Sequence, residues 1–211
     1  NLNLILPEIF ISLSIMFLLV LGVFKKNSSK FIFNLSLLVF LITGIITINE
    51  TFSVSRITLF NESIIIDYMS SLMKLITLSG GFLVLVISSS YLKIFKLHNI
   101  EYPILILSSV LGMMIMISSN DLIVFYMGLE LQSLALYVLA TYNRDQLKSS
   151  EAGLKYFVLS ALSSGLLLYG CSLVYGFSGS TNFDLISKQL SSEDYVLTFG
   201  IVFILVGLAF K

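Results

Sequence analysis

Glu130 and three lysines, Lys74, Lys155 and Lys211, lie within long apolar runs of this sequence, where a charge is costly. On membrane insertion scales an ionisable group costs about 3 kcal/mol, so such groups are candidates for proton or ion transfer. Glu130 stands about nine residues into its run, which at about 1.5 Å per residue places it near the bilayer centre, too deep for its short side chain to reach the membrane surface. This depth predicts proton transfer. The alternative is a protonated Glu130 that only hydrogen-bonds a neighbouring helix.

Polar side chains extend from Glu130 along the same run. Tyr126, Glu130, Ser133, Tyr137 and Thr141 recur at spacings of three and four residues, which is the period of one helix face. A polar stripe of this kind can hold water or pass protons along a helix. We therefore take Tyr126, Ser133 and Tyr137 as supporting residues of a site centred on Glu130.

Two of the lysines have more than one interpretation. Lys211 shares a helix face with Gly200 and Gly207, which leave room for a close neighbour, but it could equally be a cation that ends the span at the inner surface. Its apolar run is only about 24 Å long as a helix, shorter than a hydrocarbon core of about 30 Å, so we expect the natural chain to continue. Lys155 lies about four residues inside its run and is either a site residue or a surface lysine that reaches the inner headgroups.

The remaining unusual residues favour structural roles. Lys74, at the outer end of its span, is either a site residue or a surface lysine with Asp67 as a candidate partner, and we favour the surface role. Glu8 is expected to interact with the positive end of its own helix at the outer surface. His98 is expected in a solvated loop, and Cys171 as packing. One histidine and one cysteine cannot build a metal site or an iron–sulfur cluster from this chain alone.

The elements that must position these residues are membrane-spanning helices. Of the 211 residues, 57% are hydrophobic and only 11% are charged, which excludes a water-soluble globule. The runs lack the two-residue alternation of a membrane barrel, so we predict an all-α, polytopic helix bundle forming a single membrane domain over residues 1–211. The predicted spans cover residues 4–24, 31–48, 68–91, 103–118, 122–142, 152–175 and 195–211.

The connections predict helix ends and orientation. The connection from Asn49 to Asp67 has β-branched residues around Arg56 and is expected to form a short surface hairpin, and Asp121 with its polar neighbours should cap the fifth span.

Twelve cations balance twelve acids, so the sequence does not indicate a nucleic-acid partner. The odd-numbered loops carry most loop cations, which predicts that they face inward and that the N-terminus faces outward. These cations are Lys25, Lys26, Lys30, Lys93, Lys96, Arg144 and Lys148.

Three sequence motifs resemble a known family. They are Ser119-Asn120-Asp121-Leu122, GLELQSLALYVLA at Gly128 to Ala140, and EAGLKYFVLSALSSGLLLYGCSLVYGFSGST at Glu151 to Thr181. They resemble the antiporter-like, proton-pumping subunits of NADH:ubiquinone oxidoreductase (complex I), of the subunit 2 type, the N type in bacteria. Leu6-Pro7-Glu8-Ile9 and GLAFK, at Gly207 to Lys211, extend the similarity along the chain. Mrp-type sodium/proton antiporter subunits share the Glu and Lys but resemble the central motif less closely.

The resemblance implies a subunit of about fourteen helices in two inverted repeats, of which this chain is the first part. The second part would follow in the same chain or in a separate polypeptide. It further implies that Glu130 pairs with Lys211 and that Lys155 lies between or beside them in a proton path. The chain would then be a non-redox subunit that translocates protons while its partners oxidise NADH and reduce ubiquinone.

The resemblance also implies cofactors, partners and a location. FMN, iron–sulfur clusters and ubiquinone would be held by other subunits, with no cofactor or metal bound by this chain, and its partners would be other membrane subunits and the lipid bilayer. The residue usage is typical of an AT-rich genome and favours the mitochondrial inner membrane, with the bacterial plasma membrane as the alternative. Two other functions stay open: a sodium/proton antiporter without redox partners, and a structural bridge without a working proton path.

Overall fold

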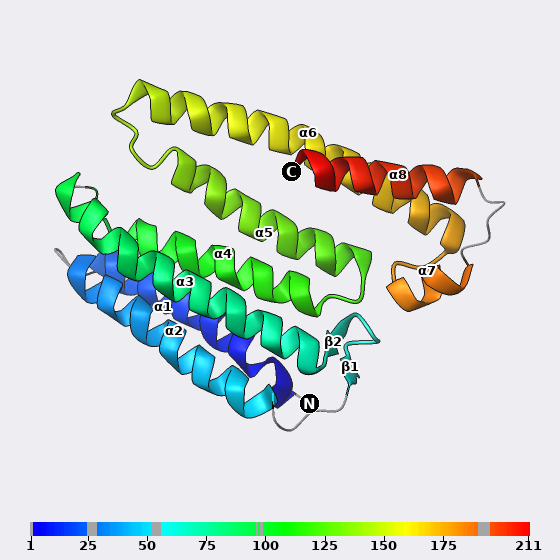
Figure 1. The fold of residues 1–211 in the computed structure, drawn as a ribbon, viewed down its shortest axis with the longest axis horizontal. Coiled ribbons are helices and arrows are strands. Elements are labelled where there is room, and N and C mark those ends of the chain that lie inside the picture. The colour runs from blue at the N-terminus through cyan, green and yellow to red at the C-terminus, as the bar shows by residue number, and fades with distance from the viewer. Residues whose placement is uncertain (1, 25–28, 52–55, 96, 98, 190–194) are drawn as a thin grey trace.

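The computed structural model describes residues 2–24, 29–51, 56–95, 97, 99–189 and 195–211. Lys25, Lys26, Lys96 and His98 lie outside these residues. The described chain contains a 3-10 turn, η1, long helices and one small hairpin (Figure 1). Their bounds are η1 Leu2–Ile5, α1 Leu6–Phe24, α2 Ser29–Thr51, β1 Ile57–Leu59, β2 Ile64–Ile66, α3 Tyr68–Ile94, α4 Glu101–Ser118, α5 Leu122–Ala140, α6 Leu147–Ser178, α7 Phe183–Gln189 and α8 Tyr195–Phe210.

The helices confirm the predicted all-α, polytopic class. Helices α1 to α6 are long and apolar enough to cross a membrane, and α8 is a shorter apolar helix of 16 residues. Helix α6 begins at Leu147, earlier than the sequence suggested, and α7 was not predicted. The connection before α3 forms the expected hairpin, in which Ile57 lies opposite Ile66. The structure therefore agrees with the predicted class and differs in where some helices begin and end.

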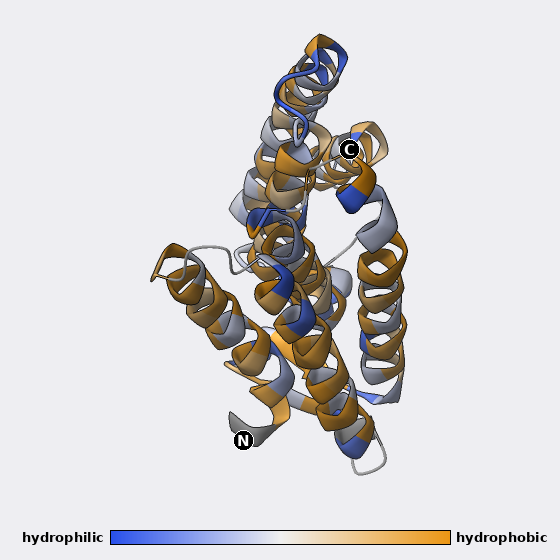
Figure 2. Ribbon diagram, turned by 90° about the vertical axis from the view of Figure 1, so that its left-hand side faces the viewer, coloured by the Kyte–Doolittle hydropathy of each residue, from blue (hydrophilic) through white to orange (hydrophobic). Residues whose placement is uncertain are grey.

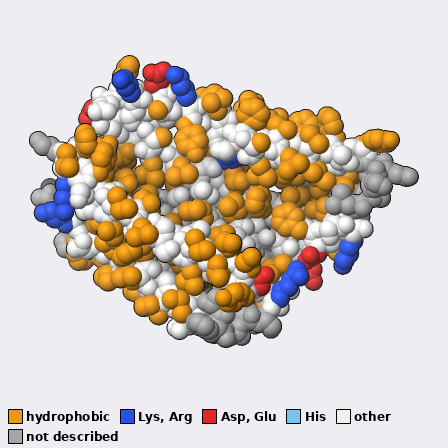
Figure 3. Space-filling view, viewed as in Figure 1, with side chains coloured by type: hydrophobic (Ala, Val, Ile, Leu, Met, Phe, Trp, Pro, Cys, Tyr) orange, Lys and Arg blue, Asp and Glu red, His pale blue; other side chains and the backbone are white. Residues whose placement is uncertain are grey.

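The helices form two neighbouring groups joined by α5. Helices α1 to α4 pack together, α5 lies against α4, and α8 packs along α6 (Figure 1). The larger group has an apolar core, in which Ile11, Leu85, Leu107 and Met114 are fully buried. Apolar residues also cover most of the outer helix surfaces, and charged side chains gather near the edges (Figures 2 and 3). This distribution fits helices whose outer faces contact lipid.

Two aspartates fix where helices begin. Asp67 caps α3, because its carboxylate accepts from the Ser70 backbone N–H at 2.7 Å while the Ser70 hydroxyl accepts from the Asp67 N–H at 2.9 Å. Asp121 caps α5 and accepts from the Ile123 N–H at 2.8 Å, as predicted. The prediction that Asp67 pairs with Lys74 was wrong, since this carboxylate serves the helix end instead.

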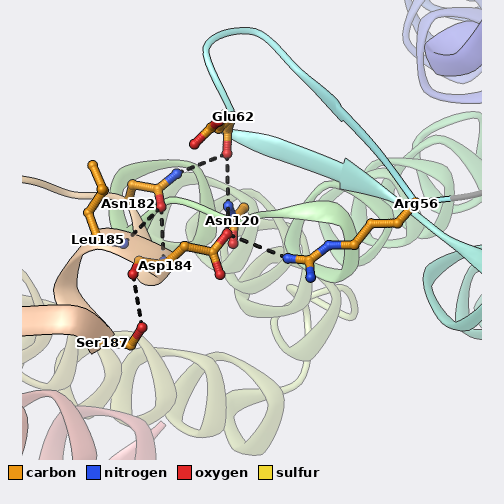
Figure 4. Close-up of polar contacts among 7 residues, drawn as sticks. All are labelled: Arg56, Glu62, Asn120, Asn182, Asp184, Leu185 and Ser187. Atoms are coloured by element: carbon orange, nitrogen blue, oxygen red, sulfur yellow. Dashed lines mark hydrogen bonds and ion pairs between the residues drawn. The ribbon is translucent and has the colours of Figure 1, made fainter.

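A polar network ties the hairpin to the rest of the bundle at one end, here called the hairpin end (residues 57–66, 119–121 and 181–189). The Glu62 carbonyl accepts from the side-chain amides of Asn120 at 3.0 Å and Asn182 at 3.1 Å (Figure 4). Asn120 also donates to Asp184 at 3.1 Å, and Arg56 lies 3.5 Å from the same carboxylate oxygen. The network joins the hairpin, the α4–α5 link and α7.

These bonds hold an unfavourable turn. Phe60, Asn61 and Glu62 have φ angles of 51°, 53° and 66°, the left-handed region that costs non-glycine residues about 1–2 kcal/mol each. The two amide bonds to Glu62 act directly on this turn. The hairpin geometry is therefore maintained by contacts from distant segments rather than by local preference.

Glycines bring two helix pairs into backbone contact. A Cβ on Gly112 of α4 would lie 2.7 Å from the Gly128 carbonyl oxygen of α5, and one on Gly128 would lie 2.8 Å from the Met116 nitrogen. A Cβ on Gly170 of α6 would likewise lie 2.8 Å from the Gly200 oxygen of α8. Side chains larger than hydrogen cannot fit at these positions without moving the backbone, so α5 is held closely to α4, and α8 to α6.

Candidate functional site

The structure brings Glu130 and Lys211 together. Glu130 lies midway along α5, and the Lys211 ammonium directly after α8 donates to Glu130 Oε1 and, at 2.7 Å, to the Ser164 hydroxyl of α6. The side chain of Lys211 is 8% exposed and that of Glu130 is 20% exposed. Three helices thus supply one acid, one amine and one hydroxyl to a largely buried ion pair.

Close packing of α8 against α6 delivers the lysine to this position. A Cβ on Gly207 would lie 2.7 Å from Leu167 Cβ and 2.9 Å from its backbone nitrogen, and the Ser163 hydroxyl donates to the Gly207 carbonyl at 2.5 Å. The close neighbour expected beside Gly200 and Gly207 is therefore α6. Figure 1 shows the end of α8 beside the middle of α6, which places Lys211 well inside the span.

A hydrogen bond between side chains joins α5 to α6 about two turns from Glu130. The Tyr137 hydroxyl donates to the Ser160 hydroxyl, and both residues are buried. Ser133, between Glu130 and Tyr137, is also buried but donates to the Leu129 carbonyl of its own helix at 2.7 Å. Tyr126 packs against the apolar cluster beside α6 and α8. The predicted stripe on α5 thus faces α6 at Glu130 and Tyr137.

The polar boundary between α5, α6 and α8 is here called the seam. Three serines of α6 that line it were not identified from the sequence. Ser160, Ser163 and Ser164 are all buried, and each bonds a partner on α5 or α8. Their spacings of three and four residues, with Leu167 following, indicate one polar helix face within an apolar span. That periodicity was available in the sequence and would have identified them.

A pocket reaches this seam from the end opposite the hairpin, here called the far end. It has a volume of about 360 Å³ and lies between the end of α5 and the start of α6. Tyr137, Thr141 and Ser150 are among the lining residues, with Gly153, Leu154 and Phe157. The pocket is open and mostly apolar, and Tyr137, which contacts Ser160, is one of its lining residues.

The structure does not bring Lys155 to the Glu130–Lys211 pair. Its ammonium lies 2.5 Å from the Glu151 carboxylate on the same helix, and its side chain is 67% exposed. Ser164, which contacts Lys211, lies nine residues further along α6, a distance of about 13 Å. In the described residues Lys155 is thus a surface partner of Glu151 rather than a link in the buried pair.

A second buried ion pair joins α1 to α3. The Lys74 ammonium lies 2.5 Å from Glu8 Oε1, with side-chain exposures of 3% and 10%. Glu8 Oε2 is buried and has no hydrogen-bond partner among the described residues, and Glu8 lines an apolar pocket of about 270 Å³ with Ser12 and Ser118. The predictions that Lys74 is a surface lysine and that Glu8 serves only its own helix were wrong, because tertiary packing joins residues 66 positions apart.

Other chemistry is not evident in the described chain. Among its residues, no group of three or more His, Cys, Asp or Glu side chains is arranged to hold a metal ion. Cys171 is buried in an apolar cluster beside Leu167 and Val174. The polar groups gathered between α5, α6 and α8 are a carboxylate, an amine and hydroxyls, all of which can exchange protons.

The chain is similar to known membrane proteins. Residues 119–211 match the family model described as NADH:quinone oxidoreductase/Mrp antiporter, TM. The chain is 71% identical over 211 residues to "NADH-quinone oxidoreductase subunit N" of Pelagibacter ubique strain HTCC1062, covering 100% of this chain and 45% of that protein. It thus spans less than half the length of this relative.

Two solved structures share the fold. One is a chain of respiratory complex I from Thermus thermophilus with bound aureothin, at a TM-score of 0.80 and 24% identity, covering 96% of this chain and 43% of that one. The other belongs to the Mrp complex from Dietzia sp. DQ12-45-1b, at a TM-score of 0.79 and 20% identity, covering 99% and 41%. At these identities the likeness shows the fold alone.

The helical fold, with a buried acid–lysine pair at the meeting of three helices, defines an antiporter-like membrane subunit. The chain belongs to the family of NADH:quinone oxidoreductase and Mrp antiporter membrane subunits. Within it, the sequence corresponds to the N-terminal part of subunit N of NADH-quinone oxidoreductase, as the resemblance implied.

Proposed function

We propose that this chain forms the N-terminal part of a proton-translocating subunit of an NADH-quinone oxidoreductase. The observation that carries the proposal is the Glu130–Lys211 pair, which three helices hold together with Ser164 inside an apolar bundle. Buried charges of this kind are expensive in a membrane and mark ion pathways. The 71% identity to a subunit N over the whole chain supports the same function.

Proton transfer would begin at the far end. Water in the pocket beside Thr141 would exchange protons with the Tyr137–Ser160 pair, and from there with the Glu130–Lys211 pair. A proton that binds Glu130 cancels its attraction for Lys211 and leaves the buried ammonium without a carboxylate partner. The pair can thus release a proton in response to one that arrives.

The energy for this transfer must come from elsewhere. Moving one charge against about 150 mV costs about 3.5 kcal/mol, which a single ion pair cannot supply in each cycle. We propose that quinone reduction in partner subunits supplies it. FMN, iron–sulfur clusters and quinone would be bound there, this chain would take no part in electron transfer, and its partners would be the other membrane subunits and the remaining part of subunit N.

The test uses inverted membrane vesicles that contain the complete enzyme with the full-length subunit. Glu130→Gln and Lys211→Met should each lower proton uptake per NADH oxidised by about tenfold or more, since each removes a proton-exchanging group. Lys188→Met is the matched control, because this exposed lysine of α7 lies outside the seam. Wild-type proton uptake in both seam variants, with normal assembly on native gels, would contradict the proposal.

Lys155 needs its own variant because its predicted role rests on the resemblance. Lys155→Met should leave proton uptake unchanged if Lys155 only pairs with Glu151 on the helix surface. A loss comparable to that of Lys211→Met would instead place Lys155 in the path, with its surface covered by protein that lies beyond this chain.

The two alternative functions are distinguished by separate measurements. A sodium/proton antiporter would exchange cations in liposomes without redox subunits, whereas a structural bridge would tolerate Glu130→Ala with normal pumping. The fold does not choose among them, since it occurs in complex I and in an Mrp complex. For the location we propose a bacterial plasma membrane, because the relative with 71% identity is bacterial; this replaces the mitochondrial membrane favoured by residue usage.

A further inference from the structure

A polar pocket of about 400 Å³ lies at the far end of the bundle, between the start of α2 and the end of α3. The lining residues are Lys30, Phe33, Asn34 and Leu37 of α2, and Val86, Ser89 and Lys93 of α3. On each helix they recur at three, four and seven residues, which is the spacing of a single face. The pocket is therefore a groove between two neighbouring helix faces.

Polarity falls with depth along this groove. Lys30 lies in the first turn of α2 and Lys93 in the last turn of the antiparallel α3, so both lysines lie at the same ends of these two apolar helices, where we expect the lipid headgroups. Asn34 and Ser89 lie about one turn deeper. Leu37 and Val86 lie about 10 Å below the lysines. The sequence of cation, neutral polar group and hydrocarbon matches the order of phosphate, glycerol and acyl chain in a phospholipid.

The charges of the groove are not compensated within the described chain. Neither lysine forms an ion pair with a described residue, and no acid is among the lining residues. Figure 3 shows cationic side chains gathered at this end of the molecule. Two such cations at headgroup level attract anions from the membrane surface.

We propose that this groove binds one anionic phospholipid, with its phosphate between Lys30 and Lys93 and an acyl chain against Leu37 and Val86. Asn34 and Ser89 would bond the glycerol ester region. A lipid fits better than free phosphate, because the deep wall of the groove is apolar and would gain nothing from a small hydrated anion. The site is separate from the Glu130–Lys211 pair and does not depend on the proposed proton path.

The test uses the complete enzyme in phosphatidylcholine vesicles that contain a small fraction of photoactivatable phosphatidylglycerol. Cross-linked peptides mapped by mass spectrometry should include residues 29–37 and 86–93. Lys30→Gln or Lys93→Gln should each lower this labelling about fivefold, and the double variant should lower it about twenty-fivefold. Lys148→Gln is the matched control, because it removes a cation near the same end without touching the groove.

Three outcomes would overturn the proposal. The first is equal labelling of these peptides by a photoactivatable phosphatidylcholine, a comparison that needs no variant and so does not depend on folding. The second is undiminished labelling in the double variant. The third is loss of labelling when inorganic phosphate is added at constant ionic strength, which would identify free phosphate as the ligand.

Discussion

Removing one partner of the Glu8–Lys74 pair should destabilise the bundle strongly, whereas removing both should not. Their charged atoms lie 2.5 Å apart, which at an effective dielectric of about 20 corresponds to an attraction of about 6.6 kcal/mol. The desolvation of two buried groups offsets much of this gain. We therefore expect Lys74→Met to cost about 3–5 kcal/mol, because it leaves the buried Glu8 charge without a partner. Glu8→Leu should cost a similar amount for the same reason.

The double variant, Glu8→Leu with Lys74→Met, should fall within about 1–2 kcal/mol of the wild type, since apolar side chains of similar size replace a pair that gains little net energy. The assay is the fraction of full-length subunit recovered in assembled enzyme on native gels after stepwise heating. Lys188→Met again serves as the exposed control. A double variant as unstable as either single variant, or single variants that match the wild type, would refute this reasoning.

Three further predictions concern positions outside the two ion pairs. Gly207→Val should lower proton uptake, because its side chain meets the α6 backbone and displaces α8; uptake at the wild-type level contradicts this. Asn120→Ala should cost about 2 kcal/mol and speed hydrogen exchange in residues 57–66, since it removes both bonds of a buried amide. Burial and, less strongly, Glu101 raise the pKa of Tyr142 to about 12. Because the unfolded pKa is about 10, stability should fall as the pH rises above 10, and Tyr142→Phe should make that fall shallower in thermal melts.

Much of the fold could be predicted, because apolar runs and capping residues act locally. The six long helices follow the apolar runs, and Asp121 caps α5 where the sequence placed a cap. The length of α6 was underestimated, since its first turn is polar and lies beyond the apolar run. Helix α7 was missed because its seven residues are too few to show a helical pattern.

The candidate site was predictable only in part. Glu130 could be identified because its depth follows from counting residues, and its pairing with Lys211 was implied by the resemblance. The Glu8–Lys74 pair could not be identified, since each residue had a plausible local role and the contact depends on how α1 and α3 pack. Lys155 shows the opposite case: a lysine in an apolar run can turn outward to an acid one turn away.

Some helix pairs of the bundle are in backbone contact and others only in side-chain contact, and this difference determines which helices could move relative to Glu130. Between α4 and α5, and between α6 and α8, backbone meets backbone, so no side chain can change rotamer to absorb a shift. The α5–α6 boundary is instead formed by side chains, including Tyr137 with Ser160, Tyr156 and Phe157. A sliding or tilting motion would therefore divide the bundle along this boundary, carrying α6 and α8 as one rigid unit past Glu130. The Glu130–Lys211 ion pair would hold the two units together, and protonation of Glu130 would remove this attraction.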